Sequence, residues 1–254
     1  MKKLFTLAVC LFTVSTLCAQ TQVIAHRGFH ATKNSRNNTI SSLQHAQDLG
    51  VYGSECDINE TKDGELIVIH GPKHGPYKNV QEENFAVLRA TKLDNGERVP
   101  TFDEYLIQAK KNTKTKLIIE IKSHPTKEQE ARVVKNILAA VKQHKLVKNV
   151  EYIAFSKYIC DQLVKNAPRG TKIAYLNGDL TPEQCKKERY TGIDYNLNTL
   201  KAHPEWINKC HELGLTVNVW TVNDKKDMQW FIDMGVDYIT TDKPDVLKRM
   251  LKDK

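Results

Sequence analysis

Residues 216–241 read TVNVWTVNDKKDMQWFIDMGVDYITT, and this stretch contains one complete unit of the predicted fold. The segments 216–220 and 237–241 are short and β-rich, whereas the segment 225–234 between them has a helical pattern that ends at Gly235. A strand, a helix and a second strand in this order form the unit from which parallel sheets are built. The stretch therefore predicts two neighbouring parallel strands joined by a helix.

The same alternation runs from one end of the chain to the other. We predict eight strands, at residues 23–26, 53–57, 116–122, 152–155, 172–176, 192–196, 216–220 and 237–241. We predict helices at residues 39–49, 101–111, 126–144, 157–166, 182–189, 204–213, 225–234 and 244–251. Alternating strands and helices in 254 residues indicate an α/β protein with a single (β/α)8 TIM barrel.

One segment departs from this alternation. An additional strand-like run at residues 66–70 is followed by residues 71–100, which are rich in Gly, Pro and Asn and are predicted to be irregular. An insertion at one end of a barrel is usually a lid or a substrate cap. We therefore expect a small inserted cap after the second strand, within one domain that spans residues 20–254.

The N-terminus is predicted to be a secretory signal peptide that is cleaved after Ala19. Two lysines precede the apolar run 4–17, and a small residue stands at the expected cleavage point. A membrane anchor is the alternative, but the run is shorter than the roughly 20 residues that span a bilayer. Lipidation at Cys18 is a further alternative, which Leu17 fits poorly. We expect an exported protein, periplasmic or extracellular, with no stable membrane span.

The composition is that of a folded globular protein, with 40% hydrophobic and 27% charged residues. Removal of the predicted signal peptide deletes two lysines and lowers the formal net charge from +8 to +6 (36 basic minus 30 acidic residues), a mild surplus. The basic residues are scattered, without an aromatic-interleaved stripe or a helix-turn-helix pattern. Nucleic-acid binding is therefore not indicated, and a small-molecule partner is expected. The oligomeric state is not readable.

Four cysteines remain after the predicted cleavage, namely Cys56, Cys160, Cys185 and Cys210. Their spacing fits neither a zinc ribbon nor a redox pair of the Cys-x-x-Cys type. Export permits disulfides, but a domain of this size does not need them. We predict that all four are packing residues.

The first predicted strand ends in three residues suited to a ligand site, His26-Arg27-Gly28. Barrel active sites are assembled at the C-terminal ends of the strands. Gly28 lets the backbone turn close to a ligand, and a guanidinium such as that of Arg27 can bind a phosphate through two hydrogen bonds. A histidine at a strand end can also be purely structural, so this position alone leaves its role open.

Three carboxylates are predicted to converge at the same end of the barrel. Side chains alternate along a strand, so Glu55 and Asp57 share one face while Cys56 points the other way. Glu120 and Lys122 end the next major strand with the same spacing of two residues. Converging carboxylates repel one another unless a cation or a proton neutralises them. An all-oxygen ligand set favours Mg²⁺ or Ca²⁺ over zinc.

His70 closes the strand-like run and would supply a second imidazole at this end. Two histidines that flank a metal-bound anion can act as general base and general acid. Such proton transfer contributes roughly 10²- to 10⁴-fold in rate. His26 and His70 are therefore the candidate catalytic residues.

These motifs together resemble the glycerophosphodiester phosphodiesterase family. The resemblance covers essentially the whole mature chain. Its motifs are His26-Arg27-Gly28, Asn37-Asn38-Thr39, Glu55-Cys56-Asp57, Thr61-Lys62-Asp63-Gly64, His70, Glu120-Ile121-Lys122, Trp220-Thr221-Val222-Asn223 and the closing run from Tyr238 to Asp245. Each motif is weak alone, but their order and spacing are specific.

The resemblance implies metal-dependent hydrolysis of glycerophosphodiesters, which are deacylated phospholipids, to glycerol 3-phosphate and an alcohol. In this family the substrate's own glycerol hydroxyl attacks phosphorus, and water then opens the cyclic phosphate. The implied roles are metal binding by Glu55, Asp57 and Glu120, acid/base catalysis by His26 and His70, phosphate binding by Arg27 and Lys122, and packing against the glycerol by Trp220.

Two positions depart from the family pattern. The family usually carries Glu-Asn-Thr where this chain has Asn37-Asn38-Thr39, so an amide replaces a carboxylate expected near the metal. The family also tends to place aspartate after the second histidine, where this chain has Gly71. The first change can lower metal affinity, and the second requires that another group orient His70. We expect activity to be kept, because the three carboxylates and both histidines are intact.

Two other functions remain open from the sequence. A phospholipase D-like enzyme acting on intact lipid would need an apolar lip on the cap, but residues 71–84 are polar. A non-catalytic glycerophosphodiester-binding protein would bind its ligand without turnover. His74 and Tyr77 lie in the predicted cap and could contact the substrate. A histidine or tyrosine in a loop is more often a surface or packing group, so we do not place them in the site.

Overall fold

The computed structural model describes residues 20–252, so the predicted signal peptide lies outside the described residues. Nine strands form one sheet in the order β1-β9-β8-β7-β6-β5-β4-β2-β3, and the pairing of β1 with β2 closes eight of them into a barrel. The strands are β1 (Gln22–Ala25), β2 (Gly53–Glu60), β3 (Leu66–Val68), β4 (Lys116–Ile121), β5 (Val150–Ala154), β6 (Ile173–Tyr175), β7 (Gly192–Asn196), β8 (Thr216–Trp220) and β9 (Tyr238–Thr241). The predicted (β/α)8 barrel is confirmed.

Parallel pairing brings the carboxyl ends of the strands to one edge of the barrel. β1 pairs with β2 on one side, with Ile24 opposite Gly53, and with β9 on the other. In the β2–β4 register Asp57 stands opposite Glu120. β3 pairs antiparallel with β2 and lies outside the ring. The strand ends that carry the predicted site residues are therefore neighbours.

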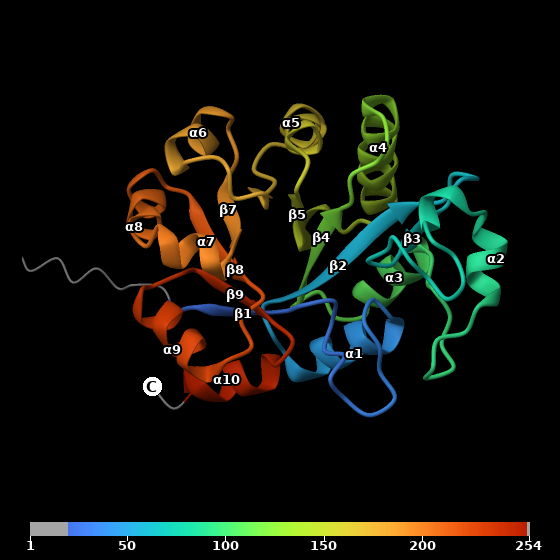
Figure 1. Ribbon diagram of the computed structural model, residues 1–254, viewed down its shortest axis with the longest axis horizontal. Helices are drawn as coiled ribbons and strands as arrows, with labels where there is room; N and C mark the ends of the chain where they lie inside the picture. Colours follow the sequence, from blue (N-terminus) through green and yellow to red (C-terminus); the bar gives the residue numbers. More distant parts are fainter. Residues whose placement is uncertain (1–19, 253–254) are drawn as a thin grey trace, which may run out of the picture.

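The helices surround the barrel (Figure 1). They are α1 (Ile40–Leu49), α2 (Phe85–Ala90), α3 (Phe102–Ala109), α4 (Lys127–Gln143), α5 (Lys157–Asn166), α6 (Pro182–Lys187), α7 (Leu197–Ala202), α8 (Glu205–Glu212), α9 (Lys225–Asp233) and α10 (Pro244–Lys252), with 3-10 turns η1 (Val80–Glu82) and η2 (Val147–Asn149). Capping boxes begin α1, α3, α4 and α6. Such caps satisfy the free N–H groups of the first turn and so fix where each helix starts.

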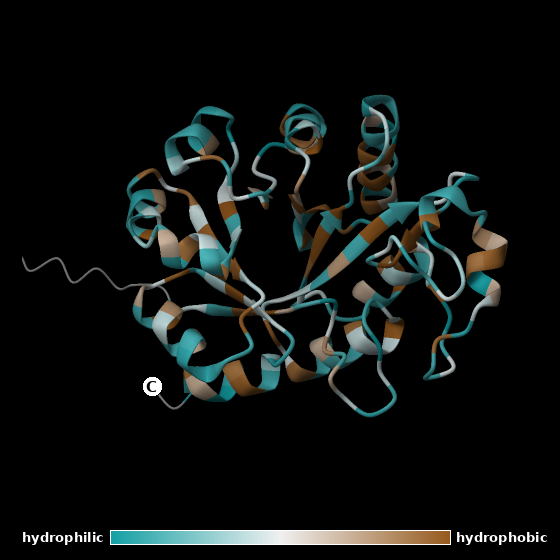
Figure 2. Ribbon diagram, viewed as in Figure 1, coloured by the Kyte–Doolittle hydropathy of each residue, from teal (hydrophilic) through white to brown (hydrophobic). Residues whose placement is uncertain are grey.

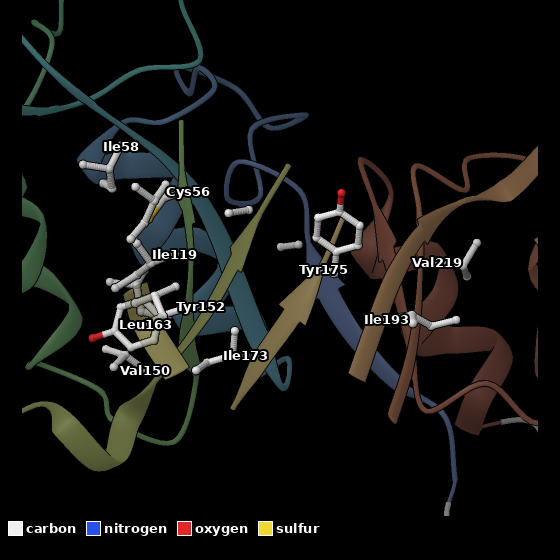
Figure 3. Close-up of a cluster of buried hydrophobic side chains, with 14 of the residues drawn as sticks. Cys56, Ile58, Ile119, Val150, Tyr152, Leu163, Ile173, Tyr175, Ile193 and Val219 are labelled. Atoms are coloured by element: carbon white, nitrogen blue, oxygen red, sulfur yellow. The ribbon is translucent and has the colours of Figure 1, made fainter. Parts of the chain in front are cut away.

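The main hydrophobic core lies between the outer face of the barrel and the helices. Figure 3 shows part of it, where Cys56 and Ile119 from neighbouring strands pack near Leu163 of α5. Helices such as α4 and α10 carry hydrophobic residues on one side and hydrophilic residues on the other (Figure 2). Trp206 and Trp230 pack against this core. The four cysteines are all buried and free, which confirms the prediction that they are packing residues.

The interior of the barrel has its own packing. Ile24, Ile118, Ile153 and Leu176 form a separate buried cluster. At the N-terminal ends of the strands, Lys172 donates to the hydroxyls of Tyr52 and Tyr238 at 2.9 and 2.8 Å and pairs with Glu151 at 3.2 Å. These side chains fill the end of the barrel opposite the predicted site. The other end, at the C-terminal edge of the strands, carries the predicted site residues.

Residues 71–100 are more ordered than predicted. They contain η1 and α2, and Val80 and Leu88 from these elements join Ile67 and Val99 in a third buried cluster. The prediction of an irregular segment is wrong because a six-residue helix is stabilised by this cluster and shows no periodicity of its own. His74 is buried and Tyr77 packs against the cluster. Among residues 20–252 no helix is long and apolar enough to span a membrane.

Candidate active site

The turn after β1 places His26, Arg27 and Gly28 at the open end of the barrel. Gly28 has φ +80°, and a Cβ there would lie 2.4 Å from Oγ of Ser42 and 2.7 Å from its backbone carbon. No other residue fits without displacing the start of α1. The Ser42 hydroxyl donates to the Arg27 carbonyl at 3.1 Å, which holds the turn against the helix.

Glu55, Asp57 and Glu120 converge beside this turn. Each offers an oxygen, and the three oxygens lie within 4.8 Å of one another. Their exposed fractions are 3, 0 and 9%, so water cannot screen their repulsion. Oε1 of Glu55 is buried and has no hydrogen-bond partner. Three clustered carboxylates, one with an unused oxygen, suit a divalent cation.

The three carboxyl groups of this cluster differ in the direction of their pKa shifts. Burial first, and then the Asp57 and Glu120 charges, raise the pKa of Glu55 well above its usual range. Burial and the Asp57 charge raise the pKa of Glu120 to about 7. Burial would also raise the pKa of Asp57, but Lys122, Arg27 and a hydrogen bond from Asn38 outweigh it and lower that pKa. A cation at this site would offset the mutual repulsion that raises the pKa values of Glu55 and Glu120.

Two cationic side chains balance Asp57. Nζ of Lys122 lies 3.1 Å from Oδ1 of Asp57 and 2.6 Å from Oε1 of Glu120. Nε of Arg27 lies 3.3 Å from Oδ2 of Asp57. Both side chains also line the pocket, so they can contact an anion there while remaining oriented by the carboxylates.

Asn38 joins the turn to β2. Its Nδ2 donates to Oδ2 of Asp57 at 2.7 Å, and its Oδ1 accepts from the Asp57 backbone N–H at 3.1 Å. Asn37, where the family usually has glutamate, is exposed. At the start of α1 the carboxylate of Glu97 accepts from the Ser41 hydroxyl at 2.7 Å. Asn38 therefore contacts the acidic cluster directly.

His70 is oriented by the main chain. Its Nδ1 donates to the Gly71 carbonyl at 2.8 Å, which leaves Nε2 as the proton acceptor. Burial lowers the pKa of this imidazole more than the Asp57 charge raises it, so the neutral form is favoured. The Gly71 backbone thus supplies the orientation that a following aspartate would otherwise give.

His26 is oriented by a carboxylate instead. Its Nδ1 lies 2.7 Å from Oδ1 of Asp242, and Nε2 of His30 lies 3.1 Å from the same oxygen. Asn223 donates to the other carboxylate oxygen at 2.6 Å. Burial alone would raise the pKa of Asp242, but hydrogen bonds from His26 and His30 outweigh it and hold that pKa well below its usual range. The ionised Asp242 can only accept, so Nδ1 of His26 is the donor to it and Nε2 is the nitrogen left for proton transfer.

An apolar wall completes the site. Nε1 of Trp220 donates to the Asp194 carbonyl at 2.9 Å, and its ring meets the ring of Phe155 edge-to-face at 5.6 Å. The pocket has a volume of about 160 Å³ and is lined by His26, Arg27, Glu55, His70, Glu120, Lys122, Ile153, Phe155, Leu176, Asp194, Trp220 and Thr240.

The pocket gathers the predicted site residues, with Asp57 contacting Lys122 and Arg27 at its edge. The sequence reasoning missed Asp194 and Phe155, which face the pocket, and the pairing of His30 with Asp242. The alternation of side chains along residues 192–196 was the available signal for Asp194. His74, considered as a ligand contact, is buried in the inserted segment and does not line the pocket.

Residues 26–246 match the sequence profile of the glycerophosphoryl diester phosphodiesterase family. The chain belongs to this family. It is 31% identical to a glycerophosphodiester phosphodiesterase from Caldanaerobacter subterraneus, over 92% of this chain and 98% of that protein. Among solved structures, a glycerophosphodiester phosphodiesterase from Parabacteroides distasonis is 41% identical, with a TM-score of 0.89 over 92% of this chain and 98% of the other.

The fold alone is shared with a phosphodiesterase from Oleispira antarctica, which is 18% identical to this chain with a TM-score of 0.80. The match covers 92% of this chain and 98% of the other. The structure of that protein contains the product sn-glycerol-3-phosphate. Membership places the protein among the phosphoric diester hydrolases that act on glycerophosphodiesters.

Proposed function

We propose that the protein is a metal-dependent hydrolase that releases glycerol 3-phosphate and an alcohol from glycerophosphodiesters. The observation that carries this proposal is the meeting of three buried carboxylates, two imidazoles and two cationic side chains in one closed-ended pocket. Family membership supports the reaction class. The product found in the Oleispira antarctica phosphodiesterase is consistent with the proposed product.

Glu55, Asp57 and Glu120 would hold Mg²⁺ or Ca²⁺. The unpartnered Oε1 of Glu55 and the charge repulsion that raises the pKa values of Glu55 and Glu120 fit a site that a cation would stabilise. When bound, the cation would polarise a phosphoryl oxygen and stabilise the charge that develops there.

Arg27 and Lys122 orient the phosphodiester. Arg27 projects from a turn that is locked by Gly28, and Lys122 is held by Asp57 and Glu120. Because both side chains are fixed before substrate binds, little rotamer freedom is lost on binding. Their positive charges offset the negative charge of the phosphate.

The two imidazoles divide the proton transfers. The neutral His70 accepts the proton of the glycerol hydroxyl next to the phosphate-bearing carbon, as that oxygen bonds to phosphorus. His26, oriented by Asp242, acts as the acid and donates a proton to the oxygen of the departing alcohol as its bond to phosphorus breaks. Water then attacks the cyclic phosphate, His26 takes its proton, and His70 returns its proton to the glycerol oxygen, which restores both residues.

The first prediction concerns turnover and chelation. The protein beginning at Gln20 is expected to release glycerol 3-phosphate from a panel of glycerophosphodiesters with added Mg²⁺ or Ca²⁺, and to lose this activity with a chelator. An enzymatic assay for glycerol 3-phosphate measures both. Folded protein that binds these compounds but turns none of them over, with any metal, would instead be the non-catalytic binding protein considered from the sequence.

The second prediction concerns the support of His26. Asp242→Asn is expected to lower kcat by about 10- to 100-fold, as for outer partners of other functional histidines. Asp245→Asn, three residues away in a surface pair with Arg249, is the matched control and should leave kcat unchanged. Steady-state kinetics with the same substrate compares the two variants, and equal activities would remove Asp242 from the mechanism.

The same substitution should lower stability in a pH-dependent way. A carboxyl whose pKa is depressed in the folded state stabilises the fold above its unfolded pKa of about 3.9, and this contribution is lost as pH falls through the folded pKa. Asp242→Asn should therefore cost about 1–2 kcal/mol of unfolding free energy at neutral pH. The difference from the parent protein should shrink in acid, as denaturant titrations at several pH values would show.

A further inference from the structure

Asp194 is a carboxyl group in the pocket that the proposed mechanism does not use. It lies in the middle of β7, where its neighbours Ile193 and Tyr195 face the outer core, so its side chain points into the barrel. It is 2% exposed and lines the pocket together with Leu176 and Trp220. It is also part of the lining of a smaller cavity of about 20 Å³ beneath. Asp194 therefore forms part of the floor of the pocket.

The Asp194 side chain is incompletely partnered. Its Oδ1 is buried and has no hydrogen-bond partner, and the side-chain amide of the neighbouring Asn218 hydrogen-bonds with Thr240. Burial raises the pKa of Asp194 to about 8, against the opposing effect of Asn218 and with a further increase from Glu120. The neutral carboxyl carries both a donor and an acceptor. An unpartnered buried polar group is costly, so its presence at this position calls for a partner that arrives with the ligand.

All glycerophosphodiesters share the glycerol and differ in the alcohol. The shared group is therefore the one that the floor of the pocket can recognise. The departing alcohol must leave through the mouth, where His70 and Phe155 are exposed. The hydroxyl next to the phosphate-bearing carbon must stay near phosphorus to attack it. The terminal hydroxyl, one carbon further on, is then free to reach the floor, where Ile153 and Leu176 offer it no polar contact.

We infer that Asp194 recognises the terminal hydroxyl of the glycerol through its unpartnered carboxyl oxygen and is a specificity-determining residue of the site. This inference rests on the proposed function. It predicts discrimination against substrates that lack only this hydroxyl. A phosphodiester of propane-1,2-diol is such a compound, because it keeps the attacking hydroxyl and so keeps the chemistry.

The test compares two substrates in three proteins. The parent enzyme should hydrolyse the glycerol compound with a kcat/KM about 10- to 100-fold above that of its propane-1,2-diol analogue, the effect of leaving one buried polar group without its partner. In Asp194→Val, kcat/KM for the glycerol compound should fall to the value for the analogue, while kcat/KM for the analogue should stay near that of the parent enzyme. Asp194→Asn keeps a donor and an acceptor and should preserve most of the preference. Asp194→Ala replaces Asp194→Val if the latter does not fold.

A preference that survives in Asp194→Val would overturn the inference and leave Asp194 partnered only by a water, for which the cavity beneath is large enough. Binding of the two products, glycerol 3-phosphate and propane-1,2-diol 1-phosphate, by calorimetry gives an independent measure. If no protein shows turnover, the proposed function fails. The product affinities then still decide whether Asp194 reads the hydroxyl.

Discussion

Glu55→Gln is expected to abolish the stabilisation of the fold by added metal and to lower kcat at least about 10³-fold. The loss in kcat follows because a metal stabilises the transition state by several kcal/mol. Glutamine keeps the shape of the side chain and can still accept the hydrogen bond from the Arg27 backbone N–H, which is 2.7 Å long. Only the charge and one metal-ligating oxygen are lost. In the parent protein, a cation at 100 times its dissociation constant should stabilise the fold by about 2.7 kcal/mol, and this gain should be absent in the variant.

Without metal the stability should change in the opposite direction. Burial and the Asp57 and Glu120 charges disfavour ionised Glu55, so a neutral glutamine should leave the metal-free fold as stable as the parent or more so. Glu151→Gln is the matched control. Glu151 lies in the same barrel at the closed end and pairs with Lys172. Its substitution should lower Tm while metal response and turnover remain.

Thermal unfolding with and without Mg²⁺ or Ca²⁺, together with turnover assays, separates these outcomes. A Glu55→Gln protein that keeps both its metal-induced rise in Tm and its activity would show that the three carboxylates do not form the metal site. Loss of activity with a drop in metal-free Tm would point to a structural role for Glu55 instead.

Strand alternation explains why much of the site was predictable. Glu55 and Asp57 are two residues apart on one strand, and Glu120 lies opposite Asp57 on its parallel neighbour, so pairing alone brings the three carboxylates together. His26 and Lys122 lie one residue beyond β1 and β4, at the edge that a barrel uses for chemistry. These relations follow from local pattern plus a single architectural rule.

The remaining features depend on contacts that the pattern does not contain. His30 meets Asp242 because the turn after β1 folds back toward the end of β9, more than two hundred residues later. α7 (Leu197–Ala202) follows β7 directly and was not predicted, because six residues are too few for a helical period to show. α2 was missed for the same reason, since it is stabilised by the buried cluster around Leu88.

His26→Gln and His70→Gln are expected to lower kcat by about 10²- to 10⁴-fold on a glycerophosphodiester of an aliphatic alcohol such as choline. A second substrate separates the two roles. The p-nitrophenyl ester of glycerol 3-phosphate has a leaving group that needs no proton. His70→Gln should remain impaired on this ester because the attacking hydroxyl still has to lose its proton. His203→Gln, on an exposed histidine that stacks on Trp206, is the control for the substitution itself.

His26→Gln should release p-nitrophenol at nearly the parent rate, within about tenfold, because the general acid is no longer needed in that step. The cyclic phosphate should then accumulate, since its opening requires His26 to take a proton from water. Phosphorus NMR detects this intermediate while absorbance follows p-nitrophenol. The opposite pattern, with His70→Gln spared on the nitrophenyl ester and His26→Gln impaired, would exchange the two roles. It would also mean that Asp242 orients the general base rather than the general acid.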